Sequence, residues 1–164
     1  MAGAGAVSIV MAVVIGFVGP SKVAEPPPSR DEVLMFVRAY IDASNGSDPT
    51  AFMDMVSRKP EVSTAEMGVI NRGWEAIRAE TDKLAGSQGT HTISLGTMDV
   101  TFLGPGYALV VAPMTIDLSV GGNQAQMRAA MTLVLEKSSG KWKVLHEHDS
   151  LQFPLGDLPG AAAD

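Results

Sequence analysis

The chain contains no cysteine, so disulfide bonds, thiolate nucleophiles and cysteine-ligated metals are all excluded. Basic residues are scarce as well: 12 Lys and Arg stand against 18 Asp and Glu, which gives a net charge of −6. Without a basic stripe a protein cannot neutralise phosphates, so no nucleic-acid partner is expected. Aromatic residues make up only 5% of the chain. Candidate chemistry therefore rests on histidines, carboxylates and hydroxyl groups.

Hydrophobic residues make up 46% and charged residues 18% of the chain, a balance that is ordinary for a globular protein and too apolar for a disordered one. Beyond an apolar N-terminal segment about 140 residues remain, enough for one domain with a single sizeable core. We expect this domain at residues 29–154 and a flexible tail at residues 155–164.

Residues 1–19 form an uncharged run of apolar and small residues, and the Pro-rich stretch 20–28 follows it. The run predicts a signal peptide or an N-terminal membrane anchor, with the proline stretch as a linker. A mis-assigned start is the alternative, because the usual positive charges before such a run are missing. The expected location is secreted, periplasmic or membrane-anchored outside the cytoplasm.

Three helices are expected in the first half of the domain. Ser29 followed by Glu32 is a capping-box pattern, and Gly46 ends the helix that it begins. Asp48 and Pro49 begin a second, short helix. The predicted inner face of the first helix carries Val33, Val37, Tyr40, Ile41 and Ser44.

The third helix follows a short extended piece at residues 61–65, and Gly86 ends it. From Gly89 onward the chain reads as four strands in a meander, separated by glycine-containing turns. This order predicts an α+β fold with three N-terminal helices packed on a strongly curved antiparallel sheet.

The curvature is predicted from two phase breaks in the apolar pattern. The strands expected at 90–103 and 106–120 change phase at Gly96 and at Pro113, and pairing the strands places these two residues opposite each other. Coinciding breaks across a hairpin indicate bulges that bend a sheet sharply. We therefore expect backbone irregularities at both positions.

The last strand, "GKWKVLHEHDS", carries the densest set of polar and aromatic groups. A turn at "SSGK" pairs Leu135 with Val144, and regular pairing then places the two histidines on the helix side of the sheet. The register predicts that alternate residues face the helices, namely Trp142, Val144, His146, His148 and Ser150. The residues predicted to face away are Lys143, Leu145, Glu147 and Asp149. A slip of one residue would exchange the two faces.

The closing strand, with Gly140, Trp142, Val144, His146, His148 and Ser150, and the stretch "GWEAIRA" at 73–79 resemble the NTF2-like superfamily. Among its branches the chain is most similar to SnoaL-like domains and to the association domain of calcium/calmodulin-dependent kinase II. The resemblance implies a cone-shaped α+β fold with a pocket between helices and sheet. It also implies a homodimer formed through the outer sheet face, which carries Thr132, Val134 and Leu145. It implies no reaction, because this fold hosts enzymes and binding domains alike.

The catalytic candidates are His146, His148 and Asp149. The histidines would act as acid or base near neutral pH, would bond a ligand, or would only be satisfied polar groups in the core. In SnoaL-like cyclases an aspartate on the sheet acts as general base, and Asp149 is similar in lying late in the chain. The predicted register, however, turns Asp149 and Glu147 outward, towards Arg128.

Two function classes stay open. The first is an exported domain that binds a small, largely apolar ligand between helices and sheet, and the second is a small enzyme of isomerase, dehydratase or cyclase type. No cofactor is expected, and no metal, because two histidines lack a third ligand. The residues predicted to bind a ligand are Tyr40, Trp74, Met114, Met131, Leu133, His146, His148 and Ser150.

Overall fold

The computed structural model describes residues 28–87 and 89–152. The predicted signal or anchor segment, most of the linker and the C-terminal tail therefore lie outside the described residues. Within the described part, no helix is long and apolar enough to cross a membrane.

The helices begin and end where their capping residues predict. The helix α1 (Arg30–Asn45) begins after Ser29, whose Oγ accepts a hydrogen bond from the Glu32 amide at 3.1 Å. The helix α2 (Pro49–Met53) is capped by Asp48, and α3 (Trp74–Ala85) ends at Gly86. The predicted caps are thus confirmed, since each satisfies backbone groups that a helix end leaves unpaired. The residues that α1 buries are Val33, Val37, Tyr40 and Ile41.

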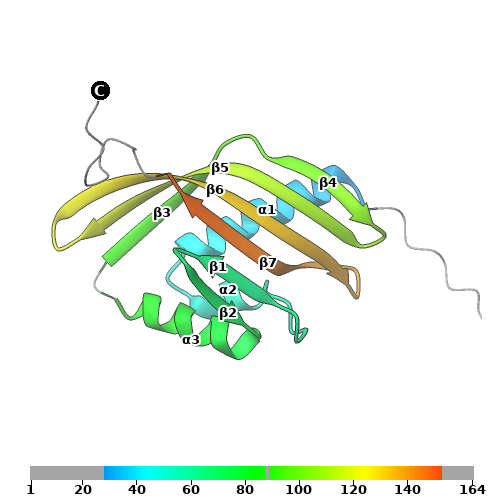
Figure 1. The fold of residues 1–164 in the computed structure, drawn as a ribbon, viewed down its shortest axis with the longest axis horizontal. Coiled ribbons are helices and arrows are strands. Elements are labelled where there is room, and N and C mark those ends of the chain that lie inside the picture. Colours follow the sequence, from blue (N-terminus) through cyan, green and yellow to red (C-terminus); the bar gives the residue numbers. More distant parts are fainter. Residues whose placement is uncertain (1–27, 88, 153–164) are drawn as a thin grey trace, which may run out of the picture.

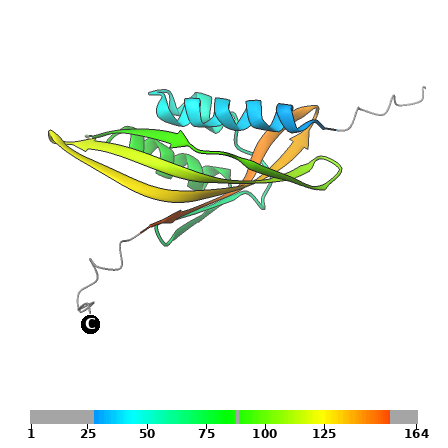
Figure 2. The same cartoon turned by 90° about the horizontal axis from the view of Figure 1, so that it is seen from above.

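Seven strands form one sheet. They are β1 (Ser63–Glu66), β2 (Val69–Arg72), β3 (Gly89–Leu95), β4 (Asp99–Gly104), β5 (Tyr107–Val120), β6 (Asn123–Ser138) and β7 (Lys141–Leu151). The spatial order is β2-β1-β7-β6-β5-β3. The strand β4 also pairs with β5, along the part of β5 that precedes its pairing with β3. The helices cover one side of this sheet (Figures 1 and 2). We call the helix side the inner face and the opposite side the outer face.

The sheet is mixed, which corrects the antiparallel prediction. The piece expected at 61–65 overlaps β1, and β1 runs parallel to β7 at the end of the meander. It also forms a hairpin with β2, so that α3 follows two paired strands rather than the single extended piece that was predicted. The hairpin thus brings residues from the first half of the domain beside the last strand.

The backbone irregularity predicted at Gly96 is confirmed, and the one predicted at Pro113 is wrong. The strand β3 ends before Gly96, whose amide donates to the Pro113 carbonyl at 2.9 Å. The strand β5, in contrast, passes through Pro113 without interruption. Its apparent phase change arose because Tyr107, Leu109 and Val111 are apolar although they point to the outer face, while Ala108, Val110 and Ala112 are buried.

Turn geometry corrects two further pairings. The register that sets Gly96 opposite Pro113 also predicts Ile93 opposite Ile116, and β3 and β5 do pair in this way. A turn at "GGNQ" predicts Asp117 opposite Arg128, but the observed β5–β6 turn is tighter, and Asp117 lies opposite Gln126. This shift of two residues leaves every side chain on its predicted face. Between β4 and β5 an irregularity at residues 102–104 shifts the register by one residue.

Gly96→Ala is expected to destabilise the fold by about 1–3 kcal/mol, because an inserted methyl overpacks a tight contact. A Cβ at this position would lie 2.7 Å from the Pro113 Cγ, and a ring held in a strand has little room to move. Urea unfolding measures the change. The matched control is Gly86→Ala, where a Cβ would meet its nearest atom, the Asp82 carbonyl oxygen, at 3.5 Å. Equal stability of the two variants would contradict the close contact between Gly96 and Pro113.

Candidate functional site

A β-bulge in β7 decides which side chains reach the inner face. Val144 pairs with Leu135, as predicted, but His146 pairs with the next residue of β6, Val134. Leu145 is therefore an extra residue with no partner in β6. Because side chains alternate along a strand, one extra residue exchanges the faces of everything that follows it.

The predicted orientation of the second half of β7 is therefore wrong. The inner-face positions are held by Glu147, with 7% of its surface exposed, and by Asp149. The residues predicted to face the helices, His146, His148 and Ser150, instead lie on the outer face. His148 and Ser150 are exposed there. Trp142 and Val144 precede the bulge and are buried as predicted.

An acidic cluster forms on the inner face around these two carboxylates. The parallel pairing of β1 with β7 places Glu66 beside Asp149 and Thr64 beside Glu147. From α1, the hydroxyl of Tyr40 donates a hydrogen bond of 2.6 Å to Glu147 Oε2. Glu66, Glu147 and Asp149, with Tyr40, are called the acidic cluster below.

Packing on α1 holds the tyrosine in place. Only 1% of the Tyr40 surface is exposed, and its ring packs on Phe52 at a centroid distance of 4.9 Å. Phe36 stacks at 6.4 Å on the same helix. The hydrogen bond to Glu147 is thus made in a largely dry environment, where the low dielectric constant strengthens it.

The pKa values of all members are raised, chiefly by burial. Burial raises the pKa of Asp149 from 3.8 to about 7, and the charge of Glu66 adds to this effect. Burial and the charges of Asp149 and Glu66 raise the pKa of Glu147 well above 4.5, against the opposing hydrogen bond from Tyr40. The pKa of Glu66 is raised by burial and by Glu80. Burial and the charge of Glu147 raise the pKa of Tyr40 well above 10.0.

No cation of the described residues forms an ion pair with this cluster. Among residues 28–87 and 89–152, none of the three carboxylates forms a salt bridge. Asp149 Oδ1 is buried, and no donor of the described chain reaches it. In the same part of the chain, no three His, Cys, Asp or Glu side chains are placed to hold a metal ion. The cluster therefore keeps a carboxyl oxygen free in an environment that favours its protonated form.

The comparisons with known proteins identify the family. The family model described as a SnoaL-like domain matches residues 33–155, most of the chain. The chain belongs to the SnoaL-like domain family. No curated protein sequence matches the chain.

Solved structures share the fold of this SnoaL-like domain. An NTF2-like superfamily protein from Salmonella enterica is 18% identical, with a TM-score of 0.69, and covers 81% of this chain and 96% of its own. A proposed calcium/calmodulin-dependent protein kinase II association domain from Xanthomonas campestris is 18% identical, with a TM-score of 0.64 and coverages of 85% and 98%. A proposed dehydratase from Streptomyces avermitilis is 15% identical, with a TM-score of 0.67 and coverages of 76% and 96%. The predicted resemblance to this superfamily is confirmed.

On the inner side, the other predicted site residues of the SnoaL-like domain lie in two different settings. Met131 and Leu133 are 0% exposed and Met114 is 3% exposed, within the hydrophobic core. Trp74 is half-buried: its Nε1 donates to the Met53 carbonyl, and the Arg58 guanidinium lies 3.5 Å from its ring centroid. These contacts give each side chain a packing role on the inner side.

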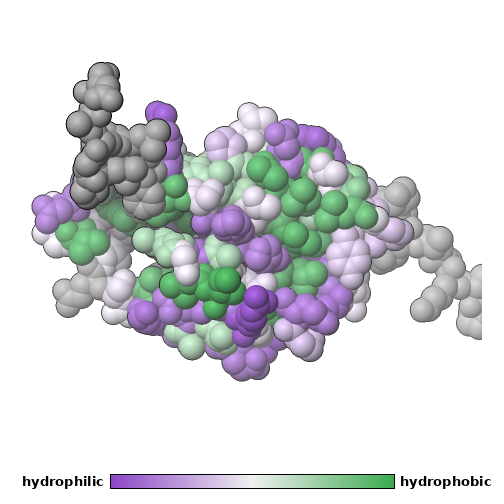
Figure 3. All heavy atoms as spheres, in the orientation of Figure 1, coloured by the Kyte–Doolittle hydropathy of each residue, from purple (hydrophilic) through white to green (hydrophobic). Residues whose placement is uncertain are grey.

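On the outer face, His146 Nδ1 lies 2.9 Å from the hydroxyl of Ser63. Figure 3 shows hydrophobic residues gathered over the part of this face formed by β4, β5 and β6. Val111 is 40% exposed there, and Val134 is half-buried. The homodimer expected through this face stays a prediction.

Sequence reasoning missed Glu66 and Glu147. Ionisable side chains are normally assigned to solvent, and no local pattern marks either residue as buried. The one available signal is the spacing of Glu147 and Asp149, because two carboxylates two residues apart on a strand lie on the same face.

Proposed function

We propose that this SnoaL-like domain binds a small molecule against its inner face and transfers a proton with Asp149 as the acid–base group. One observation carries the proposal: a carboxyl group with a pKa near 7 keeps one buried oxygen, Oδ1, without a hydrogen-bond donor in the described chain. A group with a pKa near the working pH is the most effective general acid or base. The uncommitted oxygen would take the substrate proton.

Glu147 has a different part in this proposal. It is more buried than Asp149 and is already bonded to Tyr40, so it is a positioning residue rather than the reacting group. Burial and the charge of Glu66 favour the protonated form of Asp149. Pairs of carboxyl groups whose environments separate their protonation behaviour are typical of acid–base sites.

The reaction class we propose is proton abstraction next to an activating group, as an isomerase, dehydratase or cyclase requires. The structural relative described as a proposed dehydratase is consistent with this choice, although it supports the fold alone. The second candidate is a non-catalytic domain for a small, largely apolar ligand. It is favoured by Ile93, Leu95 and Ile116, which are only half-buried against the core on the inner face. Export of the domain remains part of both proposals.

A nitrobenzisoxazole probe tests the proton transfer. Its ring opens when a base removes the ring C–H proton: the N–O bond breaks and a coloured phenolate with a nitrile forms. We expect the domain to accelerate this opening beyond free acetate, with a rate that rises through a midpoint near pH 7. Asp149→Asn is expected to lower the rate at least about a hundredfold, the smaller end of general acid–base contributions.

The matched control is His148→Asn, on the neighbouring position of the same strand but on the outer face. It should leave the rate unchanged. Carbon-13 NMR of the aspartate carboxyl groups gives an independent readout of the Asp149 titration. An Asp149 carboxyl that titrates like a free aspartate would contradict the acid–base proposal and would favour the non-catalytic binding domain.

A further inference from the structure

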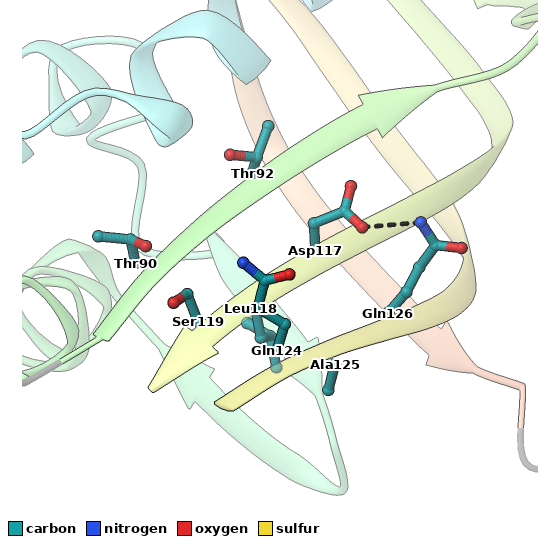
Figure 4. A pocket seen from close by; sticks show the side chains of 8 residues that line it. All are labelled: Thr90, Thr92, Asp117, Leu118, Ser119, Gln124, Ala125 and Gln126. Atoms are coloured by element: carbon teal, nitrogen blue, oxygen red, sulfur yellow. Dashed lines mark hydrogen bonds between the residues drawn. The ribbon is translucent and has the colours of Figure 1, made fainter. Parts of the chain in front are cut away.

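An open hollow of about 530 Å³ lies where β3, β5 and β6 run side by side (Figure 4). Its volume falls in the range of small-molecule sites. None of the residues that line it belongs to the acidic cluster. Six of them are polar: Thr90, Thr92, Asp117, Ser119, Gln124 and Gln126.

These six side chains form two rows across three strands. Thr90, Ser119 and Gln124 are direct neighbours across the sheet and make the first row. The second row consists of Thr92, Asp117 and Gln126. Adjacent strands lie about 4.8 Å apart, and residues two apart on a strand are separated by roughly 6.7 Å. The sheet therefore holds the hydrogen-bonding groups at fixed spacings on its outer face.

The chemistry of the rows narrows the class of ligand. Hydroxyl and amide side chains each donate and accept hydrogen bonds. The lining contains no Lys, Arg or His, and so offers no side-chain cation to an anionic ligand. Its one carboxylate, Asp117, already accepts a hydrogen bond from Gln126. The two apolar members of the lining, Leu118 and Ala125, are paired between the polar positions, so their side chains point to the other face of the sheet and offer little to an apolar ligand.

We propose that this hollow binds a neutral saccharide through the hydroxyl groups of its rings. Every hydroxyl of a sugar both donates and accepts, which matches side chains that do the same. The match extends over neighbouring rows and strands, so it suits a ligand with several hydroxyl groups at regular separations. This site lies on the opposite face of the sheet from the acidic cluster, and the proposal does not depend on proton transfer there.

The Asp117–Gln126 pair is the specific part of the site. The Gln126 Nε2 donates to Asp117 Oδ1 at 2.7 Å, which fixes the orientation of both groups (Figure 4). This bond uses one of the two amide protons, and it leaves the amide oxygen and the second carboxylate oxygen as acceptors. Two adjacent sugar hydroxyls would donate to these acceptors. Because no aromatic ring lines the hollow, stacking adds nothing, and millimolar affinity is expected.

NMR titration with three neutral oligosaccharides, cellotriose, maltotriose and chitotriose, tests the site. We expect saturable amide shifts confined to residues 90–92, 117–119 and 124–126 with at least one of them. Asp117→Ala combined with Gln126→Ala should weaken that binding about tenfold or more, because two hydrogen-bonding groups are lost. The matched control, Thr101→Ala, changes an exposed residue of β4 outside the hollow and should not alter the affinity.

Three results would overturn the assignment. The first is the absence of a saturable shift with all three sugars up to their solubility limits. The second is unchanged affinity in the double variant. The third is a set of shifts centred on Tyr40 and Asp149, which would place the sugar at the acidic cluster instead.

Discussion

Asp149→Asn is expected to stabilise the domain at about pH 8 while it removes the proposed proton transfer. The pKa of Asp149 is about 7 in the folded state, against an ordinary value of 3.8, so the folded state holds a proton that the unfolded chain releases between these values. Folding stability due to this group therefore falls as the pH rises from about 4 to about 7. Above that window the whole penalty is present.

The size of the effect follows from the shift. Each pKa unit corresponds to about 1.4 kcal/mol, and solvent reaches part of the side chain, so we expect a gain of roughly 2–4 kcal/mol for the amide variant at about pH 8. The groups that face Asp149, namely Glu66, Glu147 and Tyr40, carry no compensating positive charge. At about pH 4 the variant and the parent should have similar stabilities, because the aspartate is then protonated in the fold.

Urea unfolding at both pH values measures this difference, with His148→Asn as the control on the outer face. A variant that is more stable at about pH 8 and has lost activity would show the pattern of a functional site that costs stability. If the difference in unfolding free energy between variant and parent is instead the same at both pH values, Asp149 titrates normally in the fold. The acidic cluster is then not a strained acid–base site.

The helices could be predicted because their signals are local. Ser29, Asp48 and Gly86 mark helix ends through groups within a few residues of each other, and the spacing of Val33, Val37 and Tyr40 gives the buried face. Such signals need no knowledge of distant partners. The turns of the meander are local in the same way, so the order of the long strands also followed from the sequence.

The acidic cluster could not be predicted, because it depends on two non-local features. The strand β1 reads Ser-Thr-Ala-Glu and has no apolar alternation, so nothing in it indicates a parallel pairing with β7. No feature of the sequence indicates the bulge at Leu145 either, because a regular strand and a bulged strand have the same pairing with β6 up to Val144. Pairing arguments favoured the histidines, whereas the resemblance to SnoaL-like cyclases pointed to Asp149, which the structure places on the inner face.

Deleting Leu145 is expected to destabilise the domain by about 1–3 kcal/mol and to leave the acidic cluster in place. Without the extra residue, Val144 and His146 keep their partners in β6, so β7 pairs regularly and every side chain stays on its face. Glu147 therefore remains on the inner face, where Tyr40 donates to it. The cost is local, because the backbone at Val144 also holds hydrogen bonds to the segment after α2 and must straighten when the bulge is removed.

Leu145→Ala keeps the residue count and hence the bulge, so it separates the effect of the bulge from that of the side chain. Leu145 is only half-buried, and the alanine variant should lose about 1 kcal/mol, an ordinary cost for a substitution outside the core. Urea unfolding and amide NMR spectra of the two variants measure the difference. Both variants should keep the parent shifts around Tyr40 and Asp149. Shifts that change throughout these regions in the deletion variant alone would mean that the remaining pairs do not form again and that the acidic cluster needs the bulge itself.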